Sequence, residues 1–328
     1  MAGMTVCASV VVPTRDRYQM LERCLVALSE QTCERHLYEI LVVDDANSEC
    51  TRRQVEKWTA RPRDQCCRVR YLATGVARGP AAARNRGWRA AEGHVIAFTD
   101  DDCVPQVDWL EQGLNAFTGD VAGVSGRIIV PVEACPTDYQ RNVAHLTGAE
   151  FVTANCFYLR DEIEAAGGFD ERFTMAWRED TDLFFRLLSR GKTLVHEPSA
   201  VVTHPVRDAS WGVSLRQQRK SQFNALLYKK HPDRYRERVQ AAPPWRYYRI
   251  CGALMAALAA FFTVNRRASA ASFGLWALLT SRFCWERLTG ASHAPGHGAE
   301  MVVTSVLIPP LAVFWRIRGA VRFRVMFL

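Results

Sequence analysis

Short apolar runs recur along the first hundred residues, and polar or turn-forming residues bound each of them. These runs are residues 8–13, 38–43, 68–72 and 94–98. Their length and their β-branched content are typical of buried strands. Between the first two runs lies a helix-period stretch with Leu21, Leu25 and Leu28 on one face, and a second helix is expected over residues 81–91. Alternation of strand and helix predicts an α/β domain with a mostly parallel sheet flanked by helices.

The pattern changes beyond residue 120. Residues 121–204 predict mixed helix and strand, with a helix from about Asp180 to Leu188. A polar, basic helix is expected near residues 214–229. Three apolar stretches follow, at residues 250–264, 271–281 and 301–315. We therefore expect an α/β domain over residues 1–205, a basic helical connector over 206–245 and a hydrophobic, membrane-associated helical region over 246–328.

The net charge of +8 is divided unevenly along the chain. Residues 1–204 hold 23 Lys/Arg and 29 Asp/Glu, whereas residues 205–328 hold 19 Lys/Arg and 5 Asp/Glu, a balance of +14. Nucleic acid and an anionic membrane both attract such a region. No nucleic-acid motif is present, and the arginines flank apolar runs that are shorter than the roughly 20 residues of a spanning helix. We expect a membrane surface as partner and no nucleic acid; a buried core or a dimer interface is the alternative.

The cysteines indicate the compartment. There are eleven, an odd number, and no C-x-x-C pair occurs. A strand-like run starts almost at once, so no signal peptide is expected. These features predict a cytoplasmic protein with reduced thiols, associated with the cytoplasmic face of a membrane.

Clustered aspartates follow two of the predicted strands, Asp44-Asp45 after the second and Asp100-Asp101-Asp102 after the fourth. The first strand ends in Pro13-Thr14-Arg15-Asp16, without the glycines of a dinucleotide-binding turn. Three neighbouring carboxylates repel one another unless a cation lies between them, and Mg²⁺ or Mn²⁺ suits all-oxygen ligands together with substrate phosphates. A solvated acidic turn or a helix cap is the plainer interpretation, but the position directly after a buried strand favours a metal site.

Glu179-Asp180 opens a predicted helix. Carboxylates there cap the first turn and are stabilised by the helix dipole, which is a sufficient explanation for an isolated pair. A general base must also be held rigid and ionised, and the same position provides that. The presence of the aspartate triplet elsewhere in the chain favours the second interpretation.

Six segments in residues 8–204, taken in order, resemble the family 2 glycosyltransferases. They are Ser-Val-Val-Val-Pro-Thr-Arg-Asp at 9–16, Leu-Val-Val-Asp-Asp at 41–45, Gly-Pro-Ala-Ala-Ala-Arg-Asn-Arg-Gly at 79–87, Phe-Thr-Asp-Asp-Asp at 98–102, Gly-Gly-Phe-Asp at 167–170 and Glu-Asp-Thr-Asp-Leu at 179–183. Each segment alone is a weak signal, but six in order are a strong one. The resemblance implies a GT-A-type nucleotide-diphospho-sugar transferase fold with a basic, hydrophobic helical C-terminal region.

The resemblance also implies roles for individual residues. Asp180 would be the catalytic base, with Glu179 beside it on the acceptor side. Asp102 and Asp100 would hold Mn²⁺ or Mg²⁺, and His204 falls where many members place a further ligand, although a lone histidine is more often structural. The residues implied to bind the nucleotide sugar are Pro13, Thr14, Arg15, Asp44, Arg84, Asn85, Asp100 and Asp101.

The expected activity is inverting transfer of a sugar from a nucleotide-diphosphate donor to a hydroxyl of a lipid-linked, saccharide or small-molecule acceptor. Processive relatives carry Q-x-x-R-W, whereas Gln217-Gln218-Arg219-Lys220 lacks the tryptophan, which favours transfer of single sugars. A nucleotidyltransferase is one alternative, but the first loop lacks the glycines of that class. A membrane-bound scaffold with a degenerate transferase domain is another, yet both acidic motifs are retained.

Overall fold

The four predicted strands form one half of an eight-stranded sheet in the computed structural model, which describes residues 6–62, 64–263 and 265–327. The sheet order is β3-β2-β1-β4-β7-β6-β8-β5, with β1–β4 parallel to one another and β7 antiparallel to both of its neighbours. The strands are β1 (Ala8–Thr14), β2 (Tyr38–Asp44), β3 (Arg68–Ala73), β4 (Val95–Phe98), β5 (Val104–Pro105), β6 (Val121–Ile129), β7 (Cys156–Leu159) and β8 (Thr193–Thr203). The expected α/β class is confirmed.

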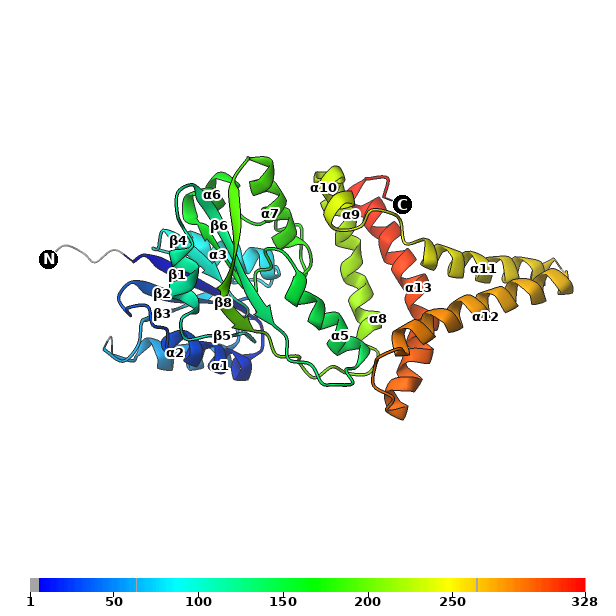
Figure 1. Cartoon of the computed structure of the whole chain (residues 1–328), viewed down its shortest axis with the longest axis horizontal. Coiled ribbons are helices and arrows are strands. Elements are labelled where there is room, and N and C mark those ends of the chain that lie inside the picture. The colour runs from blue at the N-terminus through cyan, green and yellow to red at the C-terminus, as the bar shows by residue number, and fades with distance from the viewer. Residues whose placement is uncertain (1–5, 63, 264, 328) are drawn as a thin grey trace. The chain divides into compact units, whose positions relative to one another are not determined.

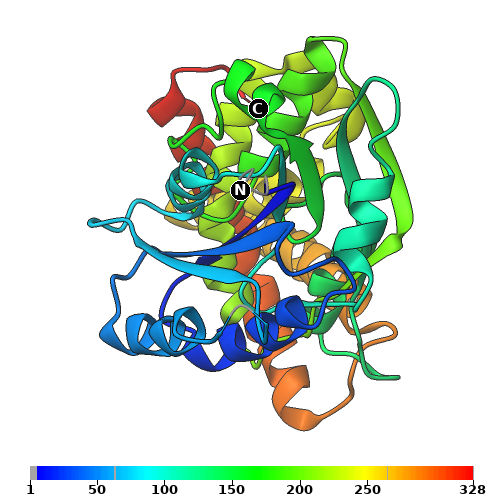
Figure 2. The ribbon, with the colours of Figure 1, turned by 90° about the vertical axis from the view of Figure 1, so that its left-hand side faces the viewer.

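The described residues divide into two units. The first unit comprises the described residues up to Pro131 together with His145–Val206, and it contains the whole sheet. Its helices are α1 (Tyr18–Ser29), α2 (Glu49–Thr59), α3 (Pro80–Ala90), α4 (Trp109–Asn115), α6 (Arg160–Ala165) and α7 (Glu179–Ser189), with a 3₁₀ turn at His145–Gly148. Figure 2 shows α1 and α2 together on one face of the sheet.

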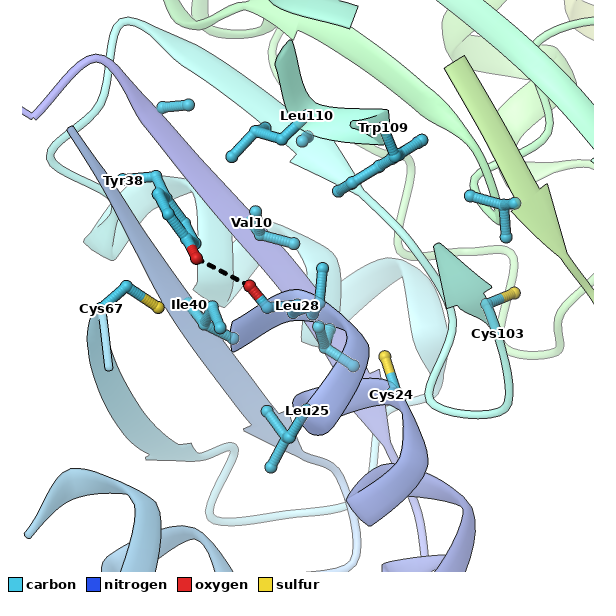
Figure 3. Packing of buried hydrophobic residues seen from close by; sticks show 14 of the residues in the cluster. Val10, Cys24, Leu25, Leu28, Tyr38, Ile40, Cys67, Cys103, Trp109 and Leu110 are labelled. Atoms are coloured by element: carbon cyan, nitrogen blue, oxygen red, sulfur yellow. Dashed lines mark hydrogen bonds between the residues drawn. The ribbon is translucent and has the colours of Figure 1, made fainter. Parts of the chain in front are cut away.

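Strand alternation assigns the side chains of β1 and β2 to two layers. Val10 and Val12 join one apolar cluster with side chains of α1, α2 and α4, including Leu25 and Trp109 (Figure 3). The Tyr38 hydroxyl donates to the Leu28 carbonyl at 2.8 Å within that cluster, so its polar atom is satisfied. The opposite face of the sheet lies against α3, where only a glycine fits at position 87. A Cβ there would lie 2.3 Å from Val11 Cγ1.

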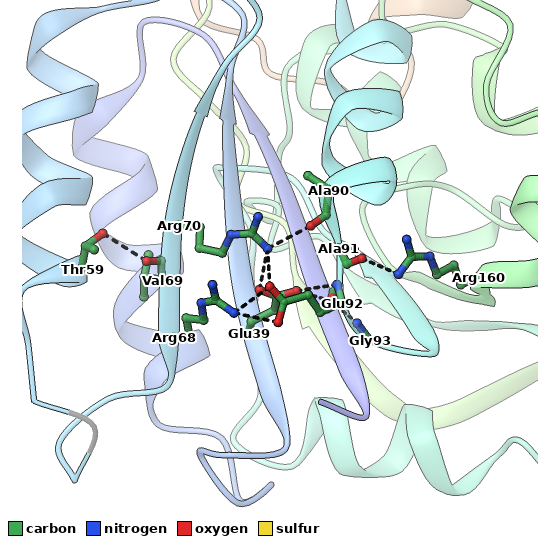
Figure 4. A network of polar contacts seen from close by, with 11 residues as sticks. Glu39, Thr59, Arg68, Val69, Arg70, Ala90, Ala91, Glu92, Gly93 and Arg160 are labelled. Carbon is green, nitrogen blue, oxygen red and sulfur yellow. Dashed lines mark hydrogen bonds and ion pairs between the residues drawn. The ribbon is translucent and has the colours of Figure 1, made fainter. Parts of the chain in front are cut away.

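A buried carboxylate near the start of β2 has a structural role. Glu39 Oε1 accepts from the Ser9 hydroxyl and from the Glu92 backbone N–H, both at 2.8 Å, and Arg70 donates to its other oxygen at 3.0 Å. Arg68 lies beside it and pairs with Glu92 at 2.7 Å (Figure 4). Because Glu39 is fully paired at the amino end of the parallel strands, it stabilises the sheet at the end opposite to Asp44.

The second unit is helical and comprises Val132–Ala144 and the residues from Arg207 onward. Its helices are α5 (Asp138–Ala144), α8 (Val213–Gln217), α9 (Gln222–Lys230), α10 (Pro232–Arg238), α11 (Trp245–Phe262), α12 (Arg266–Leu288) and α13 (Pro295–Phe323), with a 3₁₀ turn at Gln218–Ser221 (Figure 1). The helix expected near 214–229 is thus divided into three pieces. By length and composition, α13 is the one helix of the described chain that could cross a membrane.

Candidate functional site

The carboxyl ends of β1, β2 and β4 meet at one edge of the sheet because the three strands are parallel and adjacent. Thr14 lies opposite Asp44 in the β1–β2 register, and Val11 lies opposite Phe98 in the β1–β4 register, so the aspartate triplet leaves the sheet near Thr14. The Thr14 hydroxyl donates to Asp101 Oδ2 at 2.7 Å. The sheet therefore brings the first and fourth of the matched segments into direct contact.

Asp101 is held inside the domain. Arg17 donates to its Oδ1 at 2.9 Å, opposite the bond from Thr14. Burial raises the pKa of the Asp101 carboxyl, and Arg17 acts against that shift. With both oxygens engaged by the protein, Asp101 fixes the turn between Asp100 and Asp102. Sequence reasoning missed Arg17, because it lies three residues beyond the end of β1 and has no distinguishing signal.

The carboxylates of Asp44 and Asp45 both accept hydrogen bonds from loop backbone and so stabilise the loops. Asp44 accepts from the backbone N–H of Ala46 at 2.9 Å and of Ser48 at 2.7 Å, and the Tyr71 hydroxyl donates to it at 3.0 Å. Asp45 accepts from the backbone N–H of Gly79 at 3.0 Å. A carboxylate offers about four acceptor positions, so any contact between Asp44 and a nucleoside base would use the one that remains.

The side chain of Asn85 has a structural role, because all its hydrogen bonds described here go to other residues of the protein. Its amide donates to the Phe169 carbonyl at 2.8 Å and to Glu171 at 2.9 Å, and its oxygen accepts from the Phe169 N–H and from the Trp88 indole. These four bonds fix the turn at Gly168, where a Cβ would lie 2.5 Å from Asn85 Oδ1. Pro13 and the exposed Arg15 remain at the open end of β1, and Arg15 lies 3.8 Å from Asp45. Asn85 thus holds the two matched segments at 79–87 and 167–170 against each other.

Asp102 and His204 are brought together by the shortest strand of the sheet. Val104 of β5 pairs with Thr203 at the end of antiparallel β8, so the residues just before β5 and just after β8 lie side by side. His204 Nε2 lies 3.7 Å from Asp102 Oδ1, and Cys103 offers a third ligand atom within 4.8 Å. Sequence reasoning missed Cys103, because only this pairing reveals it.

The donor set fits a divalent cation. The two side chains of Asp102 and His204 are buried, and their nearest atoms are too far apart for a hydrogen bond. His204 Nδ1 has no hydrogen-bond partner among the residues described. One carboxylate and one imidazole suit Mn²⁺, and carboxylate with substrate phosphates suits Mg²⁺. Asp100, the other expected ligand, accepts from Arg84 through its Oδ1, and its part in holding a metal stays a prediction.

Arg84 joins the aspartate triplet to the second acidic motif. Its Nη2 donates to Asp100 Oδ1 and its Nη1 donates to Glu179 Oε1, both at 2.8 Å. The arginine is only 2% exposed. Burial acts to lower the pKa of its guanidinium, but Asp100 and Glu179 more than offset this and raise it. Arg84 is therefore a fixed buried cation between two carboxylates that are 79 residues apart in the chain.

Glu179 and Asp180 differ in their surroundings although they are adjacent. Glu179 is 2% exposed, and its second oxygen accepts from the Trp177 N–H at 2.7 Å. Asp180 is half-buried, in the first turn of α7, and its Oδ1 accepts from the N–H of Thr181 at 2.6 Å. The preceding residue, Arg178, adopts a left-handed backbone with φ of +76°. Such strain in a residue other than glycine is often found at functional sites.

We expect the stability of the protein to depend on pH through Glu179. Burial and the charge of Asp180 raise the pKa of Glu179 to about 7, against the lowering effect of Arg84. Between the ordinary glutamate pKa and about 7, the folded protein holds a proton that the unfolded chain releases, so this stabilisation is lost as pH rises through that range. The difference in urea midpoint between the wild type and Glu179→Gln should therefore fall from pH 5 to pH 8. A difference that is constant with pH would contradict this.

The model of the family described as glycosyl transferase family 2 matches residues 9–177. Glycosyltransferase AglE of Haloferax volcanii is 25% identical over 209 residues, covering 61% of this chain and 67% of that protein. Pre-mycofactocin glycosyltransferase of Mycobacterium tuberculosis is 31% identical over 242 residues, which are 69% of this chain and 48% of the relative. The chain thus spans about half the length of the mycobacterial protein.

A solved structure shows the same fold. It is described as mannosyltransferase PcManGT from Pyrobaculum calidifontis in complex with GDP-Man and Mn²⁺. The TM-score is 0.56 at 19% identity, over 98% of this chain and 87% of that one. The expected GT-A-type fold is confirmed by this likeness. With the family model matching more than half of its length, the chain belongs to glycosyl transferase family 2.

Proposed function

We propose that this protein transfers a sugar from a nucleotide-diphosphate donor to an acceptor hydroxyl, with a divalent cation held by Asp102 and His204 and with Asp180 as the base. One observation carries the proposal, the bridge from Asp100 through Arg84 to Glu179. It fixes the candidate metal site and the candidate base relative to each other inside one domain. The similarity to two glycosyltransferases and to a mannosyltransferase solved with GDP-Man supports a nucleotide-sugar donor.

Different residues of the site have different roles in the proposed reaction. Asp180 lies in the first turn of α7, and there it accepts the proton of the acceptor hydroxyl. Thr181 holds Oδ1 of Asp180, so the proton goes to the other oxygen. Glu179 is buried and bonded at both oxygens, and we assign it a positioning role through Arg84. When bound, Mn²⁺ or Mg²⁺ supplies positive charge to the departing diphosphate. Attack by the hydroxyl in one displacement inverts the anomeric carbon.

Donor binding tests the metal assignment without any acceptor. We would titrate the protein with UDP-, GDP- and dTDP-sugars by calorimetry, with Mn²⁺, with Mg²⁺ and with EDTA. We expect one nucleotide class to bind in a metal-dependent way. Asp102→Ala should weaken that binding at least tenfold, because perturbing even the groups that orient metal ligands costs about 10–100-fold in affinity.

Asp120→Ala is the matched control, since Asp120 is an exposed aspartate of the same unit that bonds only to Thr193 in the described structure. It should bind as the wild type does. Circular dichroism would verify that Asp102→Ala is folded. Metal-independent binding, or equal binding by Asp102→Ala, would overturn the metal site while leaving the donor site in place. No binding of any donor would overturn the proposed function itself.

A further inference from the structure

Helix α13 has its polar and apolar faces reversed relative to a helix of a water-soluble domain. The side chains that it buries include the polar ones of His297, Thr304, Ser305 and Arg316. Near its C-terminal end Arg318 and Arg322 are exposed, but its other exposed large side chains are apolar and recur about every three or four residues. They are Val302, Val303, Val306, Leu307, Phe314, Ile317 and Val321. Helices in water normally place the apolar stripe inward, so this stripe requires an apolar environment.

The buried face of α13 is already satisfied within the second unit. Arg287 of α12 donates to the hydroxyls of Thr304 at 2.7 Å and Ser305 at 3.0 Å, and it pairs with Asp138 at 2.8 Å. Farther along, Arg322 donates to the Gln222 side chain at 3.0 Å. These contacts hold α13 against α5, α9 and α12. The apolar stripe is therefore the face left for a partner outside the unit.

The α11–α12 hairpin shows the same reversal. Where the two helices meet, Ser269 of α12 donates to the Ala257 carbonyl of α11 at 3.1 Å. The outer surfaces carry large apolar side chains, and at the hairpin tip Phe261 and Phe262 are 68% and 78% exposed. A groove of about 760 Å³ lies between the helices near the tip, lined mainly by apolar side chains with Arg266 among them. Together with α13, these helices present exposed large apolar side chains of the kind that mark interaction surfaces.

The charges of the unit identify the partner. From Trp245 to Leu288 the acidic residue is Glu286, and the basic residues are Arg246, Arg249, Arg266, Arg267, Arg282 and Arg287. Arg266 and Arg267 are exposed at the tip, beside the two phenylalanines. Arginines that border exposed aromatic and aliphatic side chains match lipid headgroups that border acyl chains. A second copy of the chain offers the same arginines with Glu286 as the acidic residue of this segment, so it lacks the complementary negative charge that anionic headgroups supply.

We propose that the exposed apolar faces of α11, α12 and α13 bind the surface of a lipid bilayer with anionic headgroups. The helices lie in one leaflet instead of crossing it. The uncharged runs between Arg249 and Arg266, between Arg267 and Arg282, and between Glu300 and Arg316 are 16, 14 and 15 residues long. At about 1.5 Å per residue they reach roughly 21–24 Å, short of the hydrocarbon thickness of about 30 Å. The polar partners of α13 would also have to enter the hydrocarbon if α13 spanned it.

Vesicle co-sedimentation of the full chain tests this inference without donor or acceptor. The vesicles are phosphatidylcholine alone and phosphatidylcholine with phosphatidylglycerol. We expect binding to the mixed vesicles and weak binding to phosphatidylcholine. Phe261→Ser with Phe262→Ser should lower the affinity at least tenfold through lost apolar burial. Arg266→Gln with Arg267→Gln should lower it roughly 30-fold on the mixed vesicles only.

Val107→Ser is the control, because Val107 is an exposed apolar residue of the first unit, and it should bind as the wild type does. All the changed side chains are exposed, so the variants should fold. Equal binding to both vesicles that resists alkaline carbonate extraction would show a spanning insertion and overturn the interfacial arrangement. No vesicle binding, with a concentration-dependent dimer that the phenylalanine variant loses, would overturn the lipid assignment in favour of a second copy.

Discussion

Replacing Asp180 with asparagine is expected to lower kcat by about 10²–10⁴-fold, the usual contribution of a general base, while donor affinity stays within about twofold of the wild type. The amide keeps the shape of the carboxylate and can still accept from the Thr181 N–H. It cannot take the proton of the acceptor. The calorimetric titration described above identifies the donor. The rate of donor hydrolysis, in which water replaces the acceptor, is then measured as release of the nucleoside diphosphate.

Asp161→Asn provides the comparison for this variant. Asp161 is exposed in the first turn of α6, so it shares the helix position of Asp180 but not its neighbours. Removing the charge of Asp161 in this way should leave kcat unchanged. If Asp180→Asn kept kcat within about threefold of the wild type, the base would have to be another group. A loss of donor binding equal to the loss of kcat would instead make Asp180 a binding residue.

Arg84→Met should destabilise the fold by about 3–5 kcal/mol, the cost of removing one member of a buried ion pair. Methionine fills much of the volume of arginine but leaves Asp100 and Glu179 without the cation between them. Glu179→Gln added to Arg84→Met should restore part of the stability, because it removes one of the buried charges. Urea unfolding of the two single variants and the double variant measures this coupling.

Arg68→Met is the matched control, because Arg68 pairs with Glu92 at 2.7 Å at the surface, where both side chains are well exposed (Figure 4). Pairs of this kind are worth about 0–1 kcal/mol. An equal cost for the two substitutions would mean that the Arg84 bridge is no stronger than a surface pair. Additive effects of Arg84→Met and Glu179→Gln would show that these two residues are not coupled.

The elements of the first domain could be predicted because each follows from local pattern. β1, β2 and β4 are apolar runs that stop at polar residues, and α1 begins and ends where its leucine face does. The meeting of Thr14 with the aspartate triplet follows from the parallel order of β1 and β4. The start of α7 at Glu179 was expected to within one residue.

Other contacts depend on pairings that no short stretch of sequence encodes. Arg84 and Asn85 look alike as polar residues of α3, yet one bridges two carboxylates and the other fixes the Gly168 turn. Their roles depend on segments 84–95 residues away. Val132–Ala144 lies between two strands in the sequence but packs with the helices of the second unit. The reversed polarity of α13 is equally hidden, since a sequence shows apolar residues without showing which of them face outward.

The pairing of β5 with β8 has a consequence for how this family can diversify. With Val104 still paired to Thr203, a residue inserted between Thr203 and His204 would take the place of His204 opposite Cys103, and a residue inserted between Cys103 and Val104 would take the place of Cys103 opposite His204. The aspartate triplet would be unchanged. Two relatives with identical acidic motifs can therefore differ in the ion that they prefer, through a two-residue strand that motif comparison ignores.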